Sequence, residues 1–412
     1  MILVLDMSYT LKMFRQRQLG QALESRSLDG YFTSVVSVHP LAGLFETGVE
    51  RFGRATVTSL DAGQVFVEGK VGVAKWLQVL PPLNFALAQL SLIVLLLRMG
   101  RKTRISVVRA GDPYYLGIVG LILARCLGVP LAMRVGNRFD DVRKFNGRAN
   151  MPRLFRYIWI EKFVERFVFK RCDLIAGANE DNMHYALENG GRPDVATVFR
   201  YGNLLHPSHW LDPNRRSDPE PHLQEIGLSG KRFVVTVARL EPMKRVDETI
   251  RVVGELVRRG HDIYGLIVGD GILREQLTAY SHSLGLGQRI VFAGNRPQEW
   301  IATVLPAAAV IVSPHMGRAL AEAALSGVPI VALDYDWQRE VVVDDDTGYL
   351  ITNGAWREMA DKAELLLKDP ERARVMGGNA RAKVSTMMDP AALMHHERDT
   401  YDRLIGQWAR AQ

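Results

Sequence analysis

Residues 308–333 of this 412-residue chain have the sequence AAVIVSPHMGRALAEAALSGVPIVAL. Val310–Val312 and Ile330–Leu333 are uninterrupted apolar runs, typical of parallel strands that are covered on both faces. The segment 319–325 between them predicts a short helix in which Glu322 is the one polar side chain. A strand, a helix and a second strand in this order predict a βαβ unit of an α/β domain.

Glu322 is unusual because a carboxylate in such an apolar setting is costly unless something pairs with it. The loop before its helix opens at the carboxyl end of a strand, where open α/β sheets bind ligands. Glu322 is therefore a candidate ligand-binding acid. The alternative is a carboxylate that reaches solvent at the edge of the sheet, paired with Arg318 one turn earlier.

Length and composition indicate a globular chain with two domains. The chain is too long for one core, and 47% hydrophobic with 24% charged residues is ordinary for a globular protein. Cys126 and Cys172 have no zinc or redox spacing, so we expect reduced thiols, a cytoplasmic protein and no metal held by thiolates. Met1–Met7 lacks a basic leader and predicts a first strand, and the apolar run Phe85–Met99 predicts a core helix.

Strands and helices alternate along both halves of the chain, which predicts two doubly wound, Rossmann-like α/β domains. We expect them at 1–204 and 232–390, joined by a proline-rich linker at 205–231, with a last helix at 391–412 packing back on the first domain. The expected strands are Ile2–Leu5, Thr33–Val38, Ile105–Val108, Leu131–Val135, Leu174–Ala176, Phe233–Val237, Gly265–Val268, Ile290–Phe292, Val310–Val312 and Ile330–Leu333.

Two cations follow the first strand of the second half. Arg239 comes at the end of that strand and Lys244 lies near the start of the next helix, so together they can hold a diphosphate. The alternative is a pair of solvated loop cations. The next strand ends in Gly269-Asp270-Gly271, a tight turn that lacks the third glycine of a dinucleotide-binding fingerprint, because Arg274 stands there.

Asp334-Tyr335-Asp336 has the Asp-x-Asp form that can hold a metal–diphosphate complex. A diphosphate held by Arg239 and Lys244 does not need a divalent ion, so no metal site is predicted.

In their order along the chain these motifs resemble the retaining family 4 glycosyltransferases, which have the GT-B fold of two Rossmann-like domains facing across a cleft. The resemblance covers about Phe233 to Lys383. The matching segments are Val237–Lys244, Val268–Gly271, Phe292–Gly294, Val312–Pro314, Glu322-Ala323, Gly327–Ala332, Glu340–Val342 and Thr347-Gly348.

The resemblance implies a metal-independent hexosyltransferase that needs no cofactor and uses a UDP- or GDP-linked sugar as co-substrate. It implies that Arg239 and Lys244 bind the diphosphate and that Glu322 binds the ribose hydroxyls, with Gly269 and Gly271 in the family's glycine-rich turn. The second domain then binds the nucleotide sugar, and the first binds the acceptor.

One departure concerns the donor sugar. The family has a second Glu seven residues before the one matched by Glu322, and here Pro314 occupies that position. We expect His315 or Arg318 to replace it, and the backbone N–H groups of Met316 and Gly317 to bind sugar or phosphate oxygens.

Three polar residues of the first domain follow predicted strands and are acceptor-side candidates: Asp112, Asn137 and Asp140. Taken individually, each of them is better explained as a turn or capping residue.

The window 138–172 holds ten Lys or Arg and four Asp or Glu, a local charge of +6. Within it the helix predicted at Arg153–Lys170 has one aliphatic face, on which Ile160, Val164, Phe167 and Val168 predict contact with the core. Aromatic residues among cations on the other face suit an anionic membrane surface. The alternative is a core helix with snorkelling cations, or a helix that contacts another subunit. The membrane-surface candidates are Trp159, Lys162, Phe163, Arg166 and Lys170.

The sequence therefore favours a glycosyltransferase acting on a glycan or polyprenyl-linked acceptor in surface polysaccharide biosynthesis, at the inner face of the cell membrane. One alternative is a non-catalytic nucleotide-sugar-binding or scaffold protein, supported by the missing Glu. Another is a GT-B epimerase, which needs a carboxylate pair and a His in the cleft. No helix-turn-helix or RNA-binding motif is present, so no nucleic-acid partner is expected.

Overall fold

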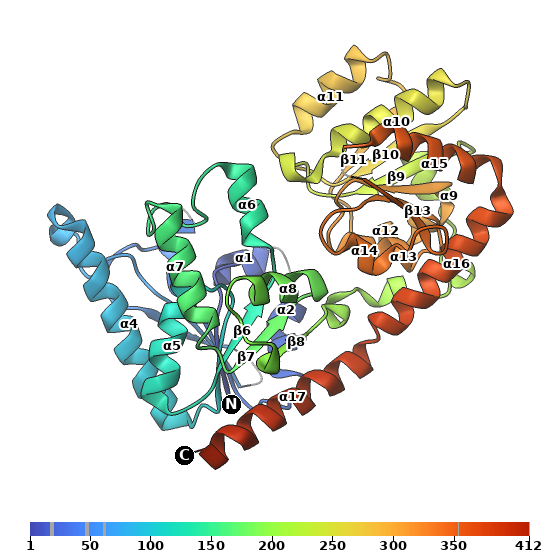
Figure 1. Ribbon diagram of the computed structural model, residues 1–412. Coiled ribbons are helices and arrows are strands. Elements are labelled where there is room, and N and C mark those ends of the chain that lie inside the picture. Colours follow the sequence, from blue (N-terminus) through green and yellow to red (C-terminus); the bar gives the residue numbers. More distant parts are fainter. Residues whose placement is uncertain (17–19, 46–48, 61–62, 353, 412) are drawn as a thin grey trace. The chain divides into compact units, whose positions relative to one another are not determined.

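A computed structural model describes residues 1–16, 20–45, 49–60, 63–352 and 354–411. The chain divides into two compact units, which Figure 1 colours along the sequence. The first unit comprises Met1–Leu204 together with Pro390–Gln412, and the second comprises Leu205–Asp389. The segment 205–231, predicted as a linker, lies in the second unit.

The first unit is built on an eight-stranded sheet in the order β3-β4-β2-β1-β5-β6-β7-β8. Every neighbouring pair is parallel except β3 and β4, which are antiparallel. The strands are β1 (Ile2–Leu5), β2 (Val35–His39), β3 (Thr56–Ser59), β4 (Gln64–Glu68), β5 (Val107–Ala110), β6 (Leu131–Val135), β7 (Leu174–Gly177) and β8 (Ala196–Val198).

Successive residues of these strands point to opposite faces of the sheet and are buried there. Leu3 and Leu5 pack in one core with α4, α5 and α7, whereas Ile2 and Val4 pack in another with α17. The helices are α1 (Leu11–Gln16), α2 (Gly20–Glu24), α3 (Ala42–Phe45), α4 (Pro81–Thr103), α5 (Tyr115–Leu127), α6 (Phe139–Asn146), α7 (Ile158–Phe169), α8 (Glu180–Glu188) and α17 (Pro390–Ala411), with short 3₁₀ turns that include η2 (Trp76–Val79).

The second unit has a wholly parallel sheet in the order β11-β10-β9-β12-β13-β14. Chain order therefore runs outward from β9 in one direction and then restarts at β12 on its other side, the doubly wound arrangement. The strands are β9 (Phe233–Val237), β10 (Tyr264–Val268), β11 (Ile290–Gly294), β12 (Val310–Ser313), β13 (Ile330–Leu333) and β14 (Gly348–Ile351).

Helices cover both faces of this second sheet (Figure 1). On one face, α10 (Val246–Arg258), α11 (Arg274–Ser283) and α15 (Trp356–Lys368) pack on Val234 and Val312. On the other, α9 (Glu220–Glu225), α12 (Gln298–Val304), α13 (Ala319–Ala324), α14 (Gln338–Val341) and α16 (Pro370–Met387) pack on Val235 and Ile311. The helices that follow the adjacent strands β9 and β12 thus leave toward opposite faces.

The predicted fold class is confirmed, because both units are α/β domains, the first with a largely parallel and the second with a wholly parallel sheet. All ten expected strands are present, with ends that differ by at most two residues. β3, β4, β8 and β14 were not predicted. β3 is short and largely exposed at the edge of its sheet, so it has no buried apolar run to reveal it.

The apolar helix α4 is only partly the core helix that the sequence predicts. By length and composition it could cross a membrane. The mean hydropathy of its most apolar 18-residue window is 1.7, and 33% of that window is buried inside the unit. Leu92 and Leu96 lie in the core of the first unit, while Leu83 and Leu90 are exposed.

The C-terminal helix contributes directly to the core of the first unit, which predicts a local effect of its mutation. Tyr401 is fully buried on α17 and contacts the rings of Phe32 and Phe199 edge-on or tilted. Tyr401→Ala should cost about 3–5 kcal/mol of stability. By hydrogen exchange, amides of β1 and β5 should lose protection while those of β9 and β12 keep it. The exposed Gln407→Ala is the control, and equal loss in both sheets would contradict the assignment of α17 to the first unit.

Candidate functional site

The loop after β9 carries the two predicted diphosphate ligands. The Arg239 side chain is 70% exposed, and its Nη1 donates to Glu241 Oε1 over 2.6 Å. Lys244 ends the 3₁₀ turn η7 (Pro242–Lys244), next to Arg245 in a left-handed conformation. Burial lowers the pKa of the Lys244 ammonium, and Asp336 only partly offsets this effect. An anion bound here would supply the missing countercharge.

The loop after β12 lies against Lys244. Gly317 has φ +67°, and a Cβ on it would stand 3.1 Å from Lys244 Nζ. The loops that follow β9 and β12 therefore meet at the point where the strand order of the second sheet reverses. That point is where open α/β sheets bind ligands.

His315 is buried beneath this junction. Its Nδ1 lies 3.1 Å from the carbonyl oxygen of Met243, and its Nε2 lies 3.0 Å from Asp336 Oδ2. Both ring nitrogens are thus engaged, so the geometry favours a positioning role over the direct sugar contact that the sequence predicts. His315 joins the loops after β9, β12 and β13.

The backbone N–H of Met316, predicted to bind substrate oxygens, donates to Ser313 Oγ over 3.3 Å instead. Ser313 Oγ in turn donates to the amide oxygen of Gln338, and the Gln338 amide nitrogen donates to the carbonyls of Pro314 and Leu333 over 3.1 and 2.8 Å. Gln338 is completely buried. It fixes the shape of the loop, and sequence reasoning missed it because a single Gln carries no motif.

Glu322 lies in the first turn of α13 and is 4% exposed. Among the described residues, none forms a hydrogen bond or an ion pair with its carboxylate. Burial raises the pKa of Glu322, and the nearby exposed Arg318 opposes that rise without reaching ion-pair distance. The alternative of a solvent-exposed Glu paired with Arg318 is therefore wrong. A buried, unpartnered acid is typical of a ligand-binding site.

Gly269 and Gly271 bring the turn after β10 into close contact with the loop that holds Arg239. A Cβ on Gly269 would stand 2.0 Å from the carbonyl oxygen of Ala238, and one on Gly271 would stand 2.5 Å from that of Leu240. Larger residues would separate the two loops. The structure thus gives both glycines a positioning function next to the candidate site.

The Asp-x-Asp motif does not present two carboxylates to one ion. Asp336 faces His315, and Asp334 forms a 2.9 Å ion pair with Arg339. Within the described parts of the chain, no group of three or more His, Cys, Asp or Glu side chains is arranged to hold a metal.

The acceptor-side candidates of the first unit have separate environments. Asp112 follows β5 and is buried, and its Oδ1 accepts from the backbone N–H groups of Tyr114 and Leu116 over 2.9 and 3.3 Å. It therefore caps the start of α5, and burial raises its pKa to about 7. Asn137 follows β6 and is exposed.

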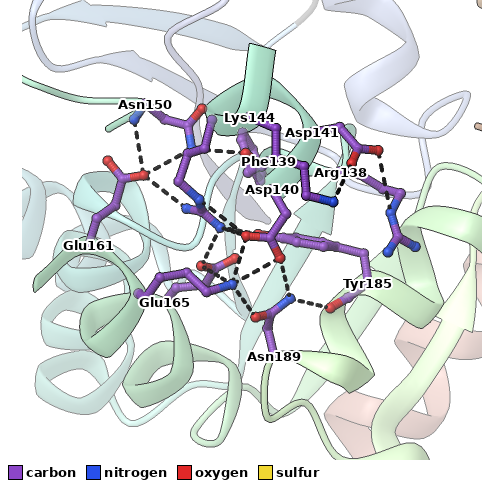
Figure 2. A network of polar contacts seen from close by, with 12 residues as sticks. Arg138, Phe139, Asp140, Asp141, Lys144, Asn150, Glu161, Glu165, Tyr185 and Asn189 are labelled. Carbon is purple, nitrogen blue, oxygen red and sulfur yellow. Dashed lines mark hydrogen bonds and ion pairs between the residues drawn. The ribbon is translucent and has the colours of Figure 1, made fainter. Parts of the chain in front are cut away.

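Asp140 belongs to a polar network centred on Arg143, which Figure 2 shows between α6 and α7. The Arg143 guanidinium donates to Glu161 Oε1 over 2.9 Å and to Glu165 Oε2 over 3.0 Å, and both acids are fully buried. Burial alone would raise the pKa of Asp140, but hydrogen bonds from Lys162 and Arg143 hold it at about 2. Asp140 thus serves the network.

This network corrects one membrane-surface candidate. Lys162 Nζ donates to both carboxylate oxygens of Asp140 over 2.8 and 2.9 Å, so its charge is neutralised inside the unit. Trp159, Phe163, Arg166 and Lys170 are exposed as predicted. Phe167, predicted on the core face, is 38% exposed and stacks on Phe163.

Comparison with known proteins identifies one family. The model of the family described as glycosyl transferases group 1 matches residues 220–383. Alpha-D-kanosaminyltransferase of Streptomyces kanamyceticus is 30% identical over 270 residues, which are 63% of this chain and 67% of that protein. D-inositol 3-phosphate glycosyltransferase of Nocardia farcinica is 32% identical over 192 residues, 44% of this chain and 43% of that protein.

Solved structures agree on the fold. A crystal structure of HepE from Anabaena in complex with UDP superposes with a TM-score of 0.72, covering 98% of this chain and 99% of that one at 19% identity. Such low identity supports the architecture and leaves substrates open. The chain also spans less than half of the inositol-phosphate enzyme that it matches.

The buried cap of α5 predicts a pH effect on stability. Because the pKa of Asp112 is about 7 in the folded chain and near 3.8 when unfolded, this group stabilises the fold below about pH 4 and loses that contribution as the pH rises through 7. Asp112→Asn keeps the accepting oxygen and cannot ionise. Its melting temperature relative to the parent should therefore rise between pH 4 and pH 7. A constant difference across that range would contradict the assignment.

Proposed function

The chain belongs to the glycosyl transferases group 1, and from this premise we propose that it is a retaining, metal-independent hexosyltransferase. Its donor is a nucleoside-diphosphate sugar, and its acceptor is a glycan or a lipid-linked saccharide. The observation that carries the proposal is the buried, unpartnered carboxylate of Glu322 beside the reversal point of the second sheet.

Glu322 provides the acceptor oxygens that a ribose diol needs. Two hydroxyl groups can donate to one carboxylate, and each such bond offsets part of the cost of burying the charge. Without a ligand that cost is uncompensated, as the raised pKa of Glu322 indicates. The acid therefore favours a polar, donor-rich ligand group over an apolar one.

Arg239 and Lys244 supply positive charge for the leaving group. Cleavage of the anomeric C–O bond leaves negative charge on the diphosphate, so fixed cations stabilise the transition state more than the ground state. Arg239 is exposed and pairs with Glu241, whereas Lys244 lies against Gly317. In this proposal the two cations do the work that a divalent ion does in other transferases.

The same arrangement supports the proposed retention. The departing diphosphate can take the acceptor proton on the face it leaves, which requires no separate protein base. The two engaged nitrogens of His315 favour this route, because a base needs a nitrogen that is free to accept.

The acceptor side of the proposal concerns a surface in the first unit. The exposed aromatic residues Trp159 and Phe163 of α7, with the cations Arg166 and Lys170, suit an anionic membrane. We therefore place the enzyme at the cytoplasmic face of the cell membrane, in surface polysaccharide or lipid-linked glycan synthesis.

A second candidate is a nucleotide-sugar-binding protein without transferase activity. Pro314 replaces the Glu expected from the resemblance, and His315 does not offer a free nitrogen in its place. Binding of the nucleotide without turnover of any sugar donor, against a broad panel of acceptors, would favour this candidate.

Nucleotide binding can be tested by thermal shift with UDP, GDP, ADP and their sugars. One nucleotide should raise the melting temperature of the parent by mass action. Arg239→Ala and Glu322→Gln should each weaken its binding by about 10- to 100-fold, because each removes charge-assisted hydrogen bonds.

Arg374→Ala is a matched control for Arg239→Ala. The Arg374 side chain is 73% exposed and pairs with Glu371 over 2.6 Å, much as Arg239 pairs with Glu241. This control should bind nucleotide like the parent. If Arg239→Ala and Glu322→Gln also did so, the site would be misplaced.

The stereochemical proposal is tested with the donor identified by thermal shift. The sugar first transferred, or first released to water, should keep the anomeric configuration of the donor, as measured by NMR during the early reaction. The opposite anomer as first product would exclude retention and leave the nucleotide site unaffected.

A further inference from the structure

The outer face of α4 and the preceding turn η2 form a continuous apolar surface. Trp76 is 77% exposed and Val79 is 80% exposed, and large apolar side chains continue along the helix at intervals of three or four residues. We call this surface the α4 ridge. It consists of Trp76, Val79, Leu80, Leu83, Leu87 and Leu90.

The α4 ridge lies on a different side of the helix from the residues that form the core. The inner face of the same helix is separate, with Ala88, Leu92 and Leu96 buried in the unit. An α-helix that is apolar on both sides needs a second apolar environment. The first unit covers only one side of it.

A second exposed aromatic cluster lies at the same edge of the unit. Helices that connect parallel strands run antiparallel to them, so α4 and α7 both begin where the strands of the first sheet end. Helix α5 contacts both of them and lies on the same core face (Figure 1). At the start of α7, Tyr157 is 50% exposed, Trp159 70% and Phe163 68%.

The charge around these aromatic residues is positive. From 147 to 170 the exposed charged residues are Arg148, Arg153, Arg156, Arg166 and Lys170, whereas the two acids of this segment, Glu161 and Glu165, are fully buried.

Exposed cations lie beside the rings of both regions. An open hollow of about 600 Å³ is lined by Arg148, Arg156, Tyr157 and Trp159, among others. At the start of η2, Lys75 is exposed, and Arg51 and Arg54 flank Phe52, which pairs with Gly72. Exposed cations beside exposed rings complement anionic head groups.

We propose that the first unit docks on an anionic lipid bilayer, with the α4 ridge inserted at the boundary of the acyl chains and the start of α7 at the level of the head groups. The α4 ridge is the inserting element because its side chains are apolar without cations among them from Trp76 to Leu90. The inference rests on the proposed function in one respect: a lipid-linked acceptor would require the enzyme to reach the membrane. Docking would hold the edge that carries Asp112 near the membrane.

Co-sedimentation with vesicles tests the inference on the full chain. The parent should bind vesicles of phosphatidylcholine with phosphatidylglycerol more tightly than vesicles of phosphatidylcholine alone. The triple variant V79S/L83S/L90S should lower the partition onto anionic vesicles by about tenfold or more, because three inserted side chains lose their transfer free energy. High salt should weaken the parent without abolishing its binding, since the apolar contribution remains.

The control variant L284S/L365S/V375S changes three apolar side chains of the second unit that are 45%, 45% and 46% exposed, and it should bind vesicles like the parent. Hydrogen-exchange protection of β1 and β5 should persist in V79S/L83S/L90S, which shows that the first unit stays folded. The nucleotide-induced melting shift should persist in both triple variants, which separates this test from the proposed function. As a second readout, brominated lipid should quench the tryptophan fluorescence of the parent more than that of Trp76→Phe.

Equal vesicle binding by the parent and V79S/L83S/L90S would overturn the proposal. Failure of the parent to bind either kind of vesicle would also overturn the proposal. A parent dimer that V79S/L83S/L90S converts to monomer, without any vesicle binding, would assign the ridge to a second copy of the chain instead.

Discussion

The candidate site depends on one constraint, the reversal of winding between β9 and β12. Because β9 continues into α10 on one face and β12 into α13 on the other, the loops after these adjacent strands diverge and leave an accessible edge. Lys244 and Gly317 come from these two loops and meet there. The same reversal places Glu322, in the first turn of α13, close behind the β12 loop and within the apolar layer.

The two units differ in whether their buried acids have a partner. In the first, Glu161 and Glu165 both pair with Arg143, and Lys162 also pairs with Glu165, so each acid has a cationic partner within the network of Figure 2. In the second, Glu322 is almost as deeply buried and has no partner among the described residues. Removing a partner from a buried charge costs several kcal/mol, so an acid left alone marks a place where binding can recover free energy. The contrast favours Glu322 as the ligand-binding acid of the proposal and a structural role for the Arg143 network.

The sequence predicts what depends on local pattern and misses what depends on contacts between distant segments. Buried parallel strands that form uninterrupted apolar runs, such as Val310–Val312, are predicted by the sequence, whereas the exposed edge strand Thr56–Ser59 and the partly polar parallel strand Gln64–Glu68 are not. In the site, the motif order placed Arg239 and Lys244 in one loop. It did not predict that His315 is engaged by Met243 and Asp336, because that contact joins three loops. Lys162 was assigned to the surface from its helical position, but Asp140 of a different helix draws it inward.

The same network also determines the character of the outer surface of α7. Because Arg143 draws Glu161 and Glu165 into the unit, the helix is oriented with its acids inside, and Trp159 and Phe163, two residues before each acid, point away from them. Burial of the acids removes the negative charge that would otherwise balance Arg166 and Lys170. The buried guanidinium, together with Val168 and Phe169 in the core, thus accounts for the orientation that exposes the aromatic residues and the cations.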